Sequence, residues 1–171
     1  MSSDQSDPAA VDLCSSWTLF FHDPDDRNWG VESYCRVCTV YTANEYWGVQ
    51  HRLDENNAIG KGMWFLMRDD VFPCWDDQSN INGGCLSYMV SKNDVARTWQ
   101  EFCELLLTER LRADGGDDAE HINGISVSPK NDFCILKVWM RTQELTAQES
   151  LRPRRSAMFT SNRSKIANDR A

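Results

Sequence analysis

Residues 133–140 read Phe-Cys-Ile-Leu-Lys-Val-Trp-Met, and this stretch determines the expected architecture. Successive side chains of a β-strand point to opposite faces of the sheet. One face of this strand is therefore wholly apolar, from Cys134 to Met140 in steps of two, and the other carries Lys137 and Trp139. We expect the first face to pack on helices and the second to line an open face of the sheet, where a ligand could bind.

Apolar and β-branched runs predict further strands on both sides of this stretch. We expect them over residues 17–21, 33–41, 63–68, 85–90 and 124–128. Capping-box spacing predicts one helix from Thr42 to about Arg52 and a short one from about Ala147 to Pro153. A longer helix should begin near Ser91 or Asn93 and end near residues 114–116. The pattern indicates an α+β fold, an antiparallel sheet with helices on one side only.

Length and composition place the chain among single-domain soluble proteins. It has 171 residues, with 41% hydrophobic and 26% charged side chains. We expect a disordered acidic tail over residues 1–12, a folded domain over 13–160 and a polar, basic tail over 161–171. The first residues lack the features of a signal peptide, and no apolar run approaches ~18 residues. These features favour a cytoplasmic protein without a membrane span.

Charge and cysteine content narrow the function classes. A net charge of −8 argues against binding long nucleic-acid backbones, although it allows one base to be held by stacking. Seven cysteines, an odd number, indicate reduced thiols. Cys35 and Cys38 form the only CxxC motif, but residues three apart on a strand point to opposite faces and could not share a metal. A thiol or metal protein stays an alternative of low weight.

Three tryptophans stand outside the expected core pattern. Trp29 follows a turn rich in Asp and Asn, and Trp75 follows Pro73 and precedes Asp76. Each loop tryptophan could pack under its own loop, or it could stack on a flat ligand whose edge a carboxylate reads. Trp47 lies on the polar stripe of the first helix, where it is either covered by a neighbouring element or an exposed anchor for a partner.

The ordered set of these residues resembles the eukaryotic translation initiation factor 4E family, the proteins that bind the messenger-RNA cap. The resemblance covers about residues 13–141 at nearly the family's spacing. Its matching segments are SWTLFF (16–21), NW (28–29), NEYW (44–47), FPCWDD (72–77), GG (83–84), TWQE (98–101), NG (123–124) and VW (138–139). It implies a curved antiparallel β-sheet with about three helices on its convex face, and makes residues 13–160 a cap-binding domain.

The same resemblance implies roles for individual residues. Trp29 and Trp75 would sandwich 7-methylguanine, Asp76 would read its edge and Trp139 would contact its methyl group. Lys130 and Lys137 would bind the cap phosphates. Partner helices of the scaffold subunit 4G or of 4E-binding proteins would dock on the convex back, on a set consisting of Trp47, Glu101 and Leu13.

Several departures from the family pattern leave a second interpretation open. Asp76 stands where the family has Glu, and Gln100 and Glu104 replace leucines of the partner groove. The family's last strands are not recognisable after Arg141. The resemblance implies a monomeric protein without cofactor or metal that recruits capped messages for translation. The departures favour the alternative of a cap-binding competitor that engages the scaffold weakly and represses translation. No catalytic pattern is legible, so we do not expect an enzyme.

Overall fold

An antiparallel sheet forms the centre of the molecule. The computed structural model describes residues 9–145, 150–153 and 155–169, and within these ranges seven strands pair in the order β2-β1-β3-β5-β6-β4-β7. The strands are β1 Asp12–His22, β2 Tyr34–Thr42, β3 Met63–Arg68, β4 Gly84–Ser91, β5 Ile122–Pro129, β6 Phe133–Met140 and β7 Met158–Ser161.

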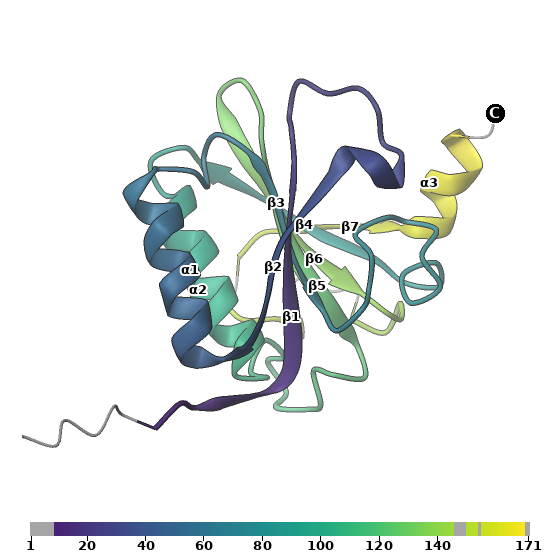
Figure 1. Cartoon of the computed structure of the whole chain (residues 1–171). Coiled ribbons are helices and arrows are strands. Elements are labelled where there is room, and N and C mark those ends of the chain that lie inside the picture. The colour runs from purple at the N-terminus through teal and green to yellow at the C-terminus, as the bar shows by residue number, and fades with distance from the viewer. Residues whose placement is uncertain (1–8, 146–149, 154, 170–171) are drawn as a thin grey trace, which may run out of the picture.

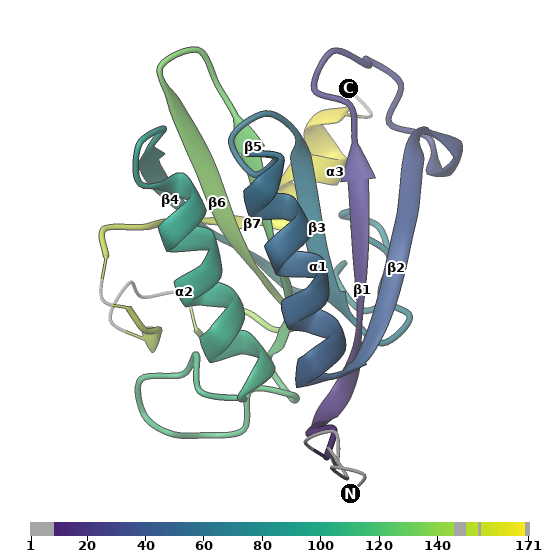
Figure 2. The same cartoon turned by 60° about the vertical axis from the view of Figure 1, so that its left-hand side comes forward.

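Helices α1 (Ala43–Glu55) and α2 (Val95–Leu107) cover one face of this sheet (Figures 1 and 2). The expected capping box is present at the start of α1, where the Thr42 side chain accepts from the Glu45 N–H and the Glu45 carboxylate accepts from the Thr42 N–H. These bonds satisfy backbone groups that a helix start leaves unpaired. The first helix is therefore predictable from local sequence.

Strand β6 has the two faces that its alternation predicts. Its apolar face is fully buried in the main core beneath the helices, which Trp17, Trp99 and Phe102 also join. Its other face places Trp139 in a smaller cluster on the opposite side of the sheet. The other members of this smaller cluster are Phe20, Phe65, Met67, Val71 and Cys85. The sheet thus has one helix-covered face and one open face with its own aromatic floor.

Helix α2 is shorter than expected, since it ends at Leu107 and not near residue 114. Thr108 caps the helix and Glu109 adopts a positive φ of 55°, which turns the chain away. The Glu109 carboxylate binds the guanidinium of Arg68, whose side chain is 2% exposed. A buried charge needs a partner, so this ion pair takes precedence over continuation of the helix.

The expected boundaries of the two tails are wrong where the structure describes them, while residues 1–8 of the N-terminal tail lie outside the described part of the chain. Strand β1 already begins at Asp12, which pairs with Thr42 at the end of β2. At the other end, Ser161 closes β7 and residues 162–169 form helix α3 (Asn162–Asp169). The side chain of Asn162 is fully buried and donates to the carbonyl of Asn80 at 2.8 Å. Polar composition predicted a tail because this long-range bond leaves no local pattern.

The third helix is also not where the sequence placed it. Of the helix expected from Ala147, residues 146–149 lie outside the described part, and Leu151 forms a bridge with Arg112. Helix α3 lies on the side of the sheet away from α1 and α2 (Figure 1). Two of the described helices therefore cover the convex face, where about three were expected. None of the described helices is long and apolar enough to cross a membrane.

Candidate functional site

A cavity of about 550 Å³ opens on the face of the sheet that the helices leave free. Strands β3, β5 and β6 form its floor, and the loops after β1 and β3 and helix α3 form its rim. The lining residues are Trp29, Tyr34, Met63, Phe65, Pro73, Cys74, Trp75, Asp76, Ser126, Val127, Ser128, Lys137, Trp139 and Ile166. The structure therefore brings Trp29, Trp75, Asp76, Trp139 and Lys137 together, as the sequence predicted.

Trp29 lies in the loop between β1 and β2 and is 55% exposed. Asn28 shapes this loop, because its backbone N–H donates to the Asp26 carboxylate and its side-chain oxygen accepts from the Gly30 N–H. One face of the Trp29 indole stacks on the imidazole of His22, with ring centroids 4.3 Å apart and planes 5° apart. The ring is thus held from one side and presents a flat aromatic surface at the rim of the cavity.

Trp75 lies in the loop between β3 and β4, which a carboxylate and a buried amide hold in shape. Asp77 accepts from the N–H groups of Phe72 and Ser79. The Asn80 amide is fully buried and donates to the carbonyls of Phe72 and Cys74. Of the two carboxylates after Trp75, Asp77 therefore closes the loop, and exposed Asp76 is left to face the cavity.

Two ionisable groups, the Cys74 thiol and the Tyr34 phenol, lie near the Asp76 carboxylate. Burial, together with the neighbouring Asp76 carboxylate, raises the pKa of the Cys74 thiol to about 12. Burial, with added repulsion from Cys74 and Asp76, likewise raises the pKa of the Tyr34 phenol to about 12. Both groups stay neutral at pH 7, so the carboxylate of Asp76 supplies the negative charge here. Such a group can accept hydrogen bonds from donors on the edge of a bound ring.

Trp139 belongs to the floor of the cavity and is only 3% exposed. Its indole Nε1 donates to the Ser126 hydroxyl at 2.9 Å, which satisfies the buried donor. The ring also lies against Phe65, with centroids 6.4 Å apart. Trp139 can therefore offer an apolar edge to a ligand at the bottom of the cavity but cannot form a stacking wall.

Basic side chains gather at another part of the rim. Lys137 lines the cavity, and burial together with the nearby charge of Lys165 lowers its pKa to about 8. The Lys165 Nζ lies 4.6 Å from the centroid of the Trp75 ring, a cation–π contact. Lys130 lies at the exposed β5–β6 turn, outside the lining residues, but its charge also lowers the Lys137 pKa. An anionic ligand group would relieve the repulsion among these lysines.

Sequence reasoning missed several members of this site. Tyr34 falls at the start of a predicted strand, where an aromatic residue is ordinary. Lys165 and Ile166 fall in the segment expected to be a tail. Ser126 does share a strand face with Ser128, two residues away, and this alternation is the one signal that could have placed them on the open face.

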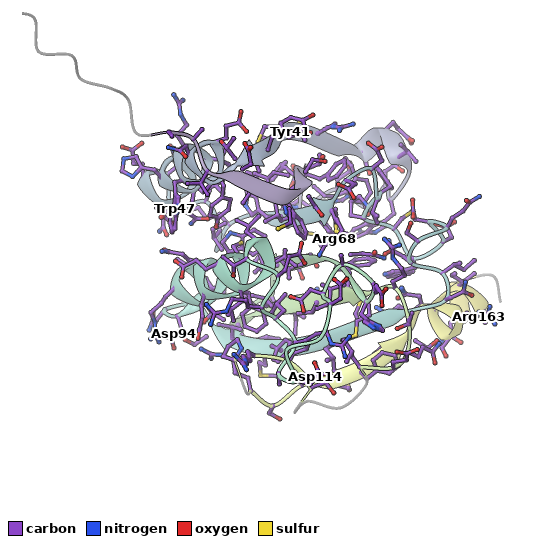
Figure 3. All side chains as sticks on the ribbon, turned by 90° about the horizontal axis from the view of Figure 1, so that it is seen from below. Tyr41, Trp47, Arg68, Asp94, Asp114 and Arg163 are labelled. Carbon is purple, nitrogen blue, oxygen red and sulfur yellow. The ribbon has the colours of Figure 1, made fainter. Side chains whose placement is uncertain are left out.

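The three residues expected to bind a partner lie on the side of the helices. Figure 3 labels Trp47 there, with Arg163 of α3 at the far side of the sheet. Trp47 is 45% exposed and contacts Tyr46 edge-on, with centroids 5.4 Å apart. Leu13 is partly buried against the main core. Glu101 on α2 is already engaged, because Arg155 donates to its carboxylate at 3.3 Å.

The placement of Cys35 and Cys38 does not support the alternative of a thiol or metal protein within the described part of the chain. Cys35 and Cys38 are free thiols; the first is exposed and the second packs against the main core. Among the described residues, no group of three or more His, Cys, Asp or Glu side chains is placed to hold a metal ion.

The family model described as eukaryotic initiation factor 4E matches residues 12–166, nearly the whole described chain. The chain belongs to the eukaryotic initiation factor 4E family. The matched range extends past Arg141 and includes β7 and most of α3. The resemblance described in the sequence analysis ended at about Arg141.

Individual relatives agree with this family assignment. Eukaryotic translation initiation factor 4E of Eremothecium gossypii is 24% identical over 136 residues, which are 76% of this chain and 62% of that protein. Eukaryotic translation initiation factor NCBP of Arabidopsis thaliana is 34% identical over 120 residues, which are 69% of this chain and 52% of that protein. The chain therefore spans between about half and two thirds of the length of these relatives.

Solved structures share the fold at low sequence identity. The Ascaris suum factor 4E-3 in complex with an m2,2,7G cap superposes with a TM-score of 0.68 at 19% identity, over 80% of this chain and 76% of that one. A schistosome factor 4E complexed with m7GpppA and 4E-BP gives 0.70 at 23%, over 80% and 75%. The sheet with helices on one face is thus the fold of this family.

Proposed function

We propose that this protein binds the 7-methylguanosine cap of messenger RNA in its open-face cavity and recruits capped messages for translation initiation in the cytoplasm. The observation that carries the proposal is the placing of Trp29, Trp75 and Asp76 around one cavity with lysines at its rim. The related factors complexed with caps support it, as does family membership. The role is one of binding, without catalysis.

The chemistry of the cap fits these side chains. Methylation of N7 gives guanine a positive charge, and the electron-rich face of an indole attracts cations. Trp29 and Trp75 would therefore hold the methylated base more strongly than guanine, which keeps only the stacking. Asp76 would accept from the ring N–H and the exocyclic amine, a pair of donors that adenine does not present.

The remaining side chains would bind the rest of the cap. Lys137, with Lys165 beside it and Lys130 at the nearby turn, would hold the phosphates, since three like charges gain from an anion between them. Trp139 would contact the base from the floor of the cavity. Binding of this kind should weaken with salt, because phosphate contacts are screened.

Retention on 7-methylguanosine resin tests the proposal. Trp75→Ala removes one stacking wall and should cost about 1–3 kcal/mol of binding free energy. Asp76→Ala removes the acceptor and should cost about 1.5–3 kcal/mol. Cys14→Ala, an exposed residue of β1 outside the cavity lining, is the matched control and should bind as wild type. If Trp75→Ala and Asp76→Ala are both retained on the resin as strongly as wild type, the proposal is wrong.

The convex face bears on a second candidate, a cap-binding competitor that engages scaffold proteins weakly. We propose that partner helices dock on Trp47, with Glu101 as acceptor and Leu13 at the edge of the set. Gln100 donates to Glu104 at 3.1 Å, and Arg155 already binds Glu101, so a partner would meet a polar, occupied surface. These two contacts would weaken engagement of a partner helix, which is the property that distinguishes the competitor from a recruiting factor.

Calorimetry with a scaffold-type helical peptide separates the two roles. Trp47→Ala should abolish peptide binding and leave cap retention unchanged, since Trp47 lies on α1 and the cavity opens on the face of the sheet that the helices leave free. Gln100→Leu with Glu104→Leu, and separately Arg155→Ala, should strengthen peptide binding if the polar surface is what weakens it. If wild type and Trp47→Ala bind the peptide equally, Trp47 is not the anchor.

A further inference from the structure

His22 is a fully buried histidine that the proposed cap chemistry does not use. It is the last residue of β1, with 0% exposure, and it lies directly beneath the Trp29 ring. The two rings are nearly parallel, 5° apart, at a centroid distance of 4.3 Å. Because Trp29 is 55% exposed, this stack is a major contact that fixes the plane of its indole. The edge of Tyr34 meets the same imidazole, with centroids 4.9 Å apart.

The second contact of His22 is to the backbone of the same loop. Its Nε2 lies 2.8 Å from the carbonyl oxygen of Asn28, the residue that precedes Trp29. A carbonyl oxygen can only accept, so Nε2 carries the proton and donates. Nδ1 is buried and has no hydrogen-bond partner among the described residues. Among the described residues, the bond to Asn28 is therefore the one polar contact that orients the imidazole.

We propose that His22 is a positioning residue for cap recognition, which holds the ring and backbone of Trp29 so that one indole face is closed and the other is free for the methylated base. This inference rests on the proposed function. His22 thereby sets the orientation of this side of the cavity.

Two substitutions at His22 separate its two contacts. His22→Phe keeps a flat ring beneath Trp29 and loses the bond to Asn28. His22→Leu loses both contacts but keeps an apolar side chain in the buried position. For an aromatic pair we expect His22→Leu to weaken binding of 7-methylguanosine triphosphate by about 3- to 10-fold and His22→Phe to restore most of it. In a Trp29→Ala background, His22→Leu should cause no further loss, because the ring that it positions is gone.

The test is fluorescence titration of wild type, His22→Phe, His22→Leu, Trp29→Ala and the Trp29→Ala, His22→Leu double variant, with urea unfolding to confirm that each is folded. Equal affinity of His22→Leu and wild type would overturn the inference, and so would an equal loss with and without Trp29. Fluorine NMR of 5-fluorotryptophan-labelled protein reports on the contact between residue 22 and Trp29 without ligand. The Trp29 resonance should move in His22→Leu and stay near its wild-type position in His22→Phe. If wild type fails to bind, the proposed function fails, and the NMR result still reports whether His22 holds the ring.

Discussion

The two tryptophans at the rim of the cavity are supported in different ways. Trp29 is held by His22, seven positions earlier in the chain, and by hydrogen bonds within its own loop. Trp75 is held by a network of buried asparagines that lie far apart in the sequence. Asn123 donates to the Ser79 carbonyl and the Asn80 side chain, and Asn162 donates to the Asn80 carbonyl.

The difference lies in how much of the fold each wall requires. The Trp29 wall needs the end of β1 and one turn, so it depends on local structure. The Trp75 wall joins the β3–β4 loop to β5 and to the start of α3, so it depends on the assembled sheet. We therefore expect substitutions near Trp29 to change binding with small effects on stability, and substitutions in the asparagine network to change both.

The largest effect is expected for Asn80→Ala. The Asn80 side chain donates to the carbonyls of Phe72 and Cys74 and accepts from Asn123. A buried polar group left without a partner costs about 1–3 kcal/mol. The free energy of unfolding measured in urea should fall by at least about 2 kcal/mol by that rule. Gln78→Ala, at an exposed position of the same loop, should change it by under about 0.5 kcal/mol. If the Asn80 hydrogen bonds do not stabilise the fold, Asn80→Ala and Gln78→Ala should lower the free energy of unfolding by equal, small amounts.

An intermediate effect is expected from pH, through Lys137, which lines the cavity. The pKa of Lys137 is lowered to about 8, so its ammonium is mostly charged at pH 7 and mostly neutral at pH 9. Phosphates bind the charged form. Affinity for 7-methylguanosine triphosphate should therefore fall about tenfold between pH 7 and pH 9, as one proton must be taken up on binding.

Two controls isolate that lysine from other titrating groups. Lys137→Met should remove this part of the pH dependence, and 7-methylguanosine without phosphates should not show it. Lys165→Ala should move the fall to higher pH, because a neighbouring positive charge no longer lowers the pKa of Lys137. An identical pH profile for wild type and Lys137→Met would contradict the assignment.

The smallest effect is expected for Cys74→Ala. The Cys74 thiol is a weak hydrogen-bond donor close enough to Asp76 for that carboxylate to help raise its pKa, so it can compete with a ligand for the carboxylate. Without it the carboxylate is free to accept both guanine donors, and cap affinity should rise by about 2- to 3-fold, within the net worth of one such bond. Fluorescence titration checks the value. In an Asp76→Ala background, Cys74→Ala should leave cap affinity unchanged. A loss of affinity would show that the thiol positions the carboxylate and does not compete with the ligand.

Local sequence patterns were sufficient for much of the fold and for the main walls of the site. The alternation from Cys134 to Met140 separates the two faces of the sheet in the structure as in the sequence. The capping box at Thr42 starts α1 as expected. Trp29, Trp75 and Asp76 were found because tryptophans beside turn residues fall outside any core pattern. Their roles in binding stay predictions, as do those of Lys130, Lys137 and Trp139.

The misses have a common physical origin in polar side chains that are buried through distant partners. Glu109 ends α2 because it pairs with Arg68, 41 residues away. Asn162 anchors helix α3, where a tail was expected, because it bonds to Asn80, 82 residues away. Neither residue belongs to a periodic apolar pattern, so neither carries a local signal. Hydrophobic periodicity is a property of residues that are close in the sequence. The sequence alone therefore determined which residues lie on each face of this sheet. Which polar groups meet across the fold depends on how the strands and loops assemble, so only the tertiary structure decided what supports Trp75.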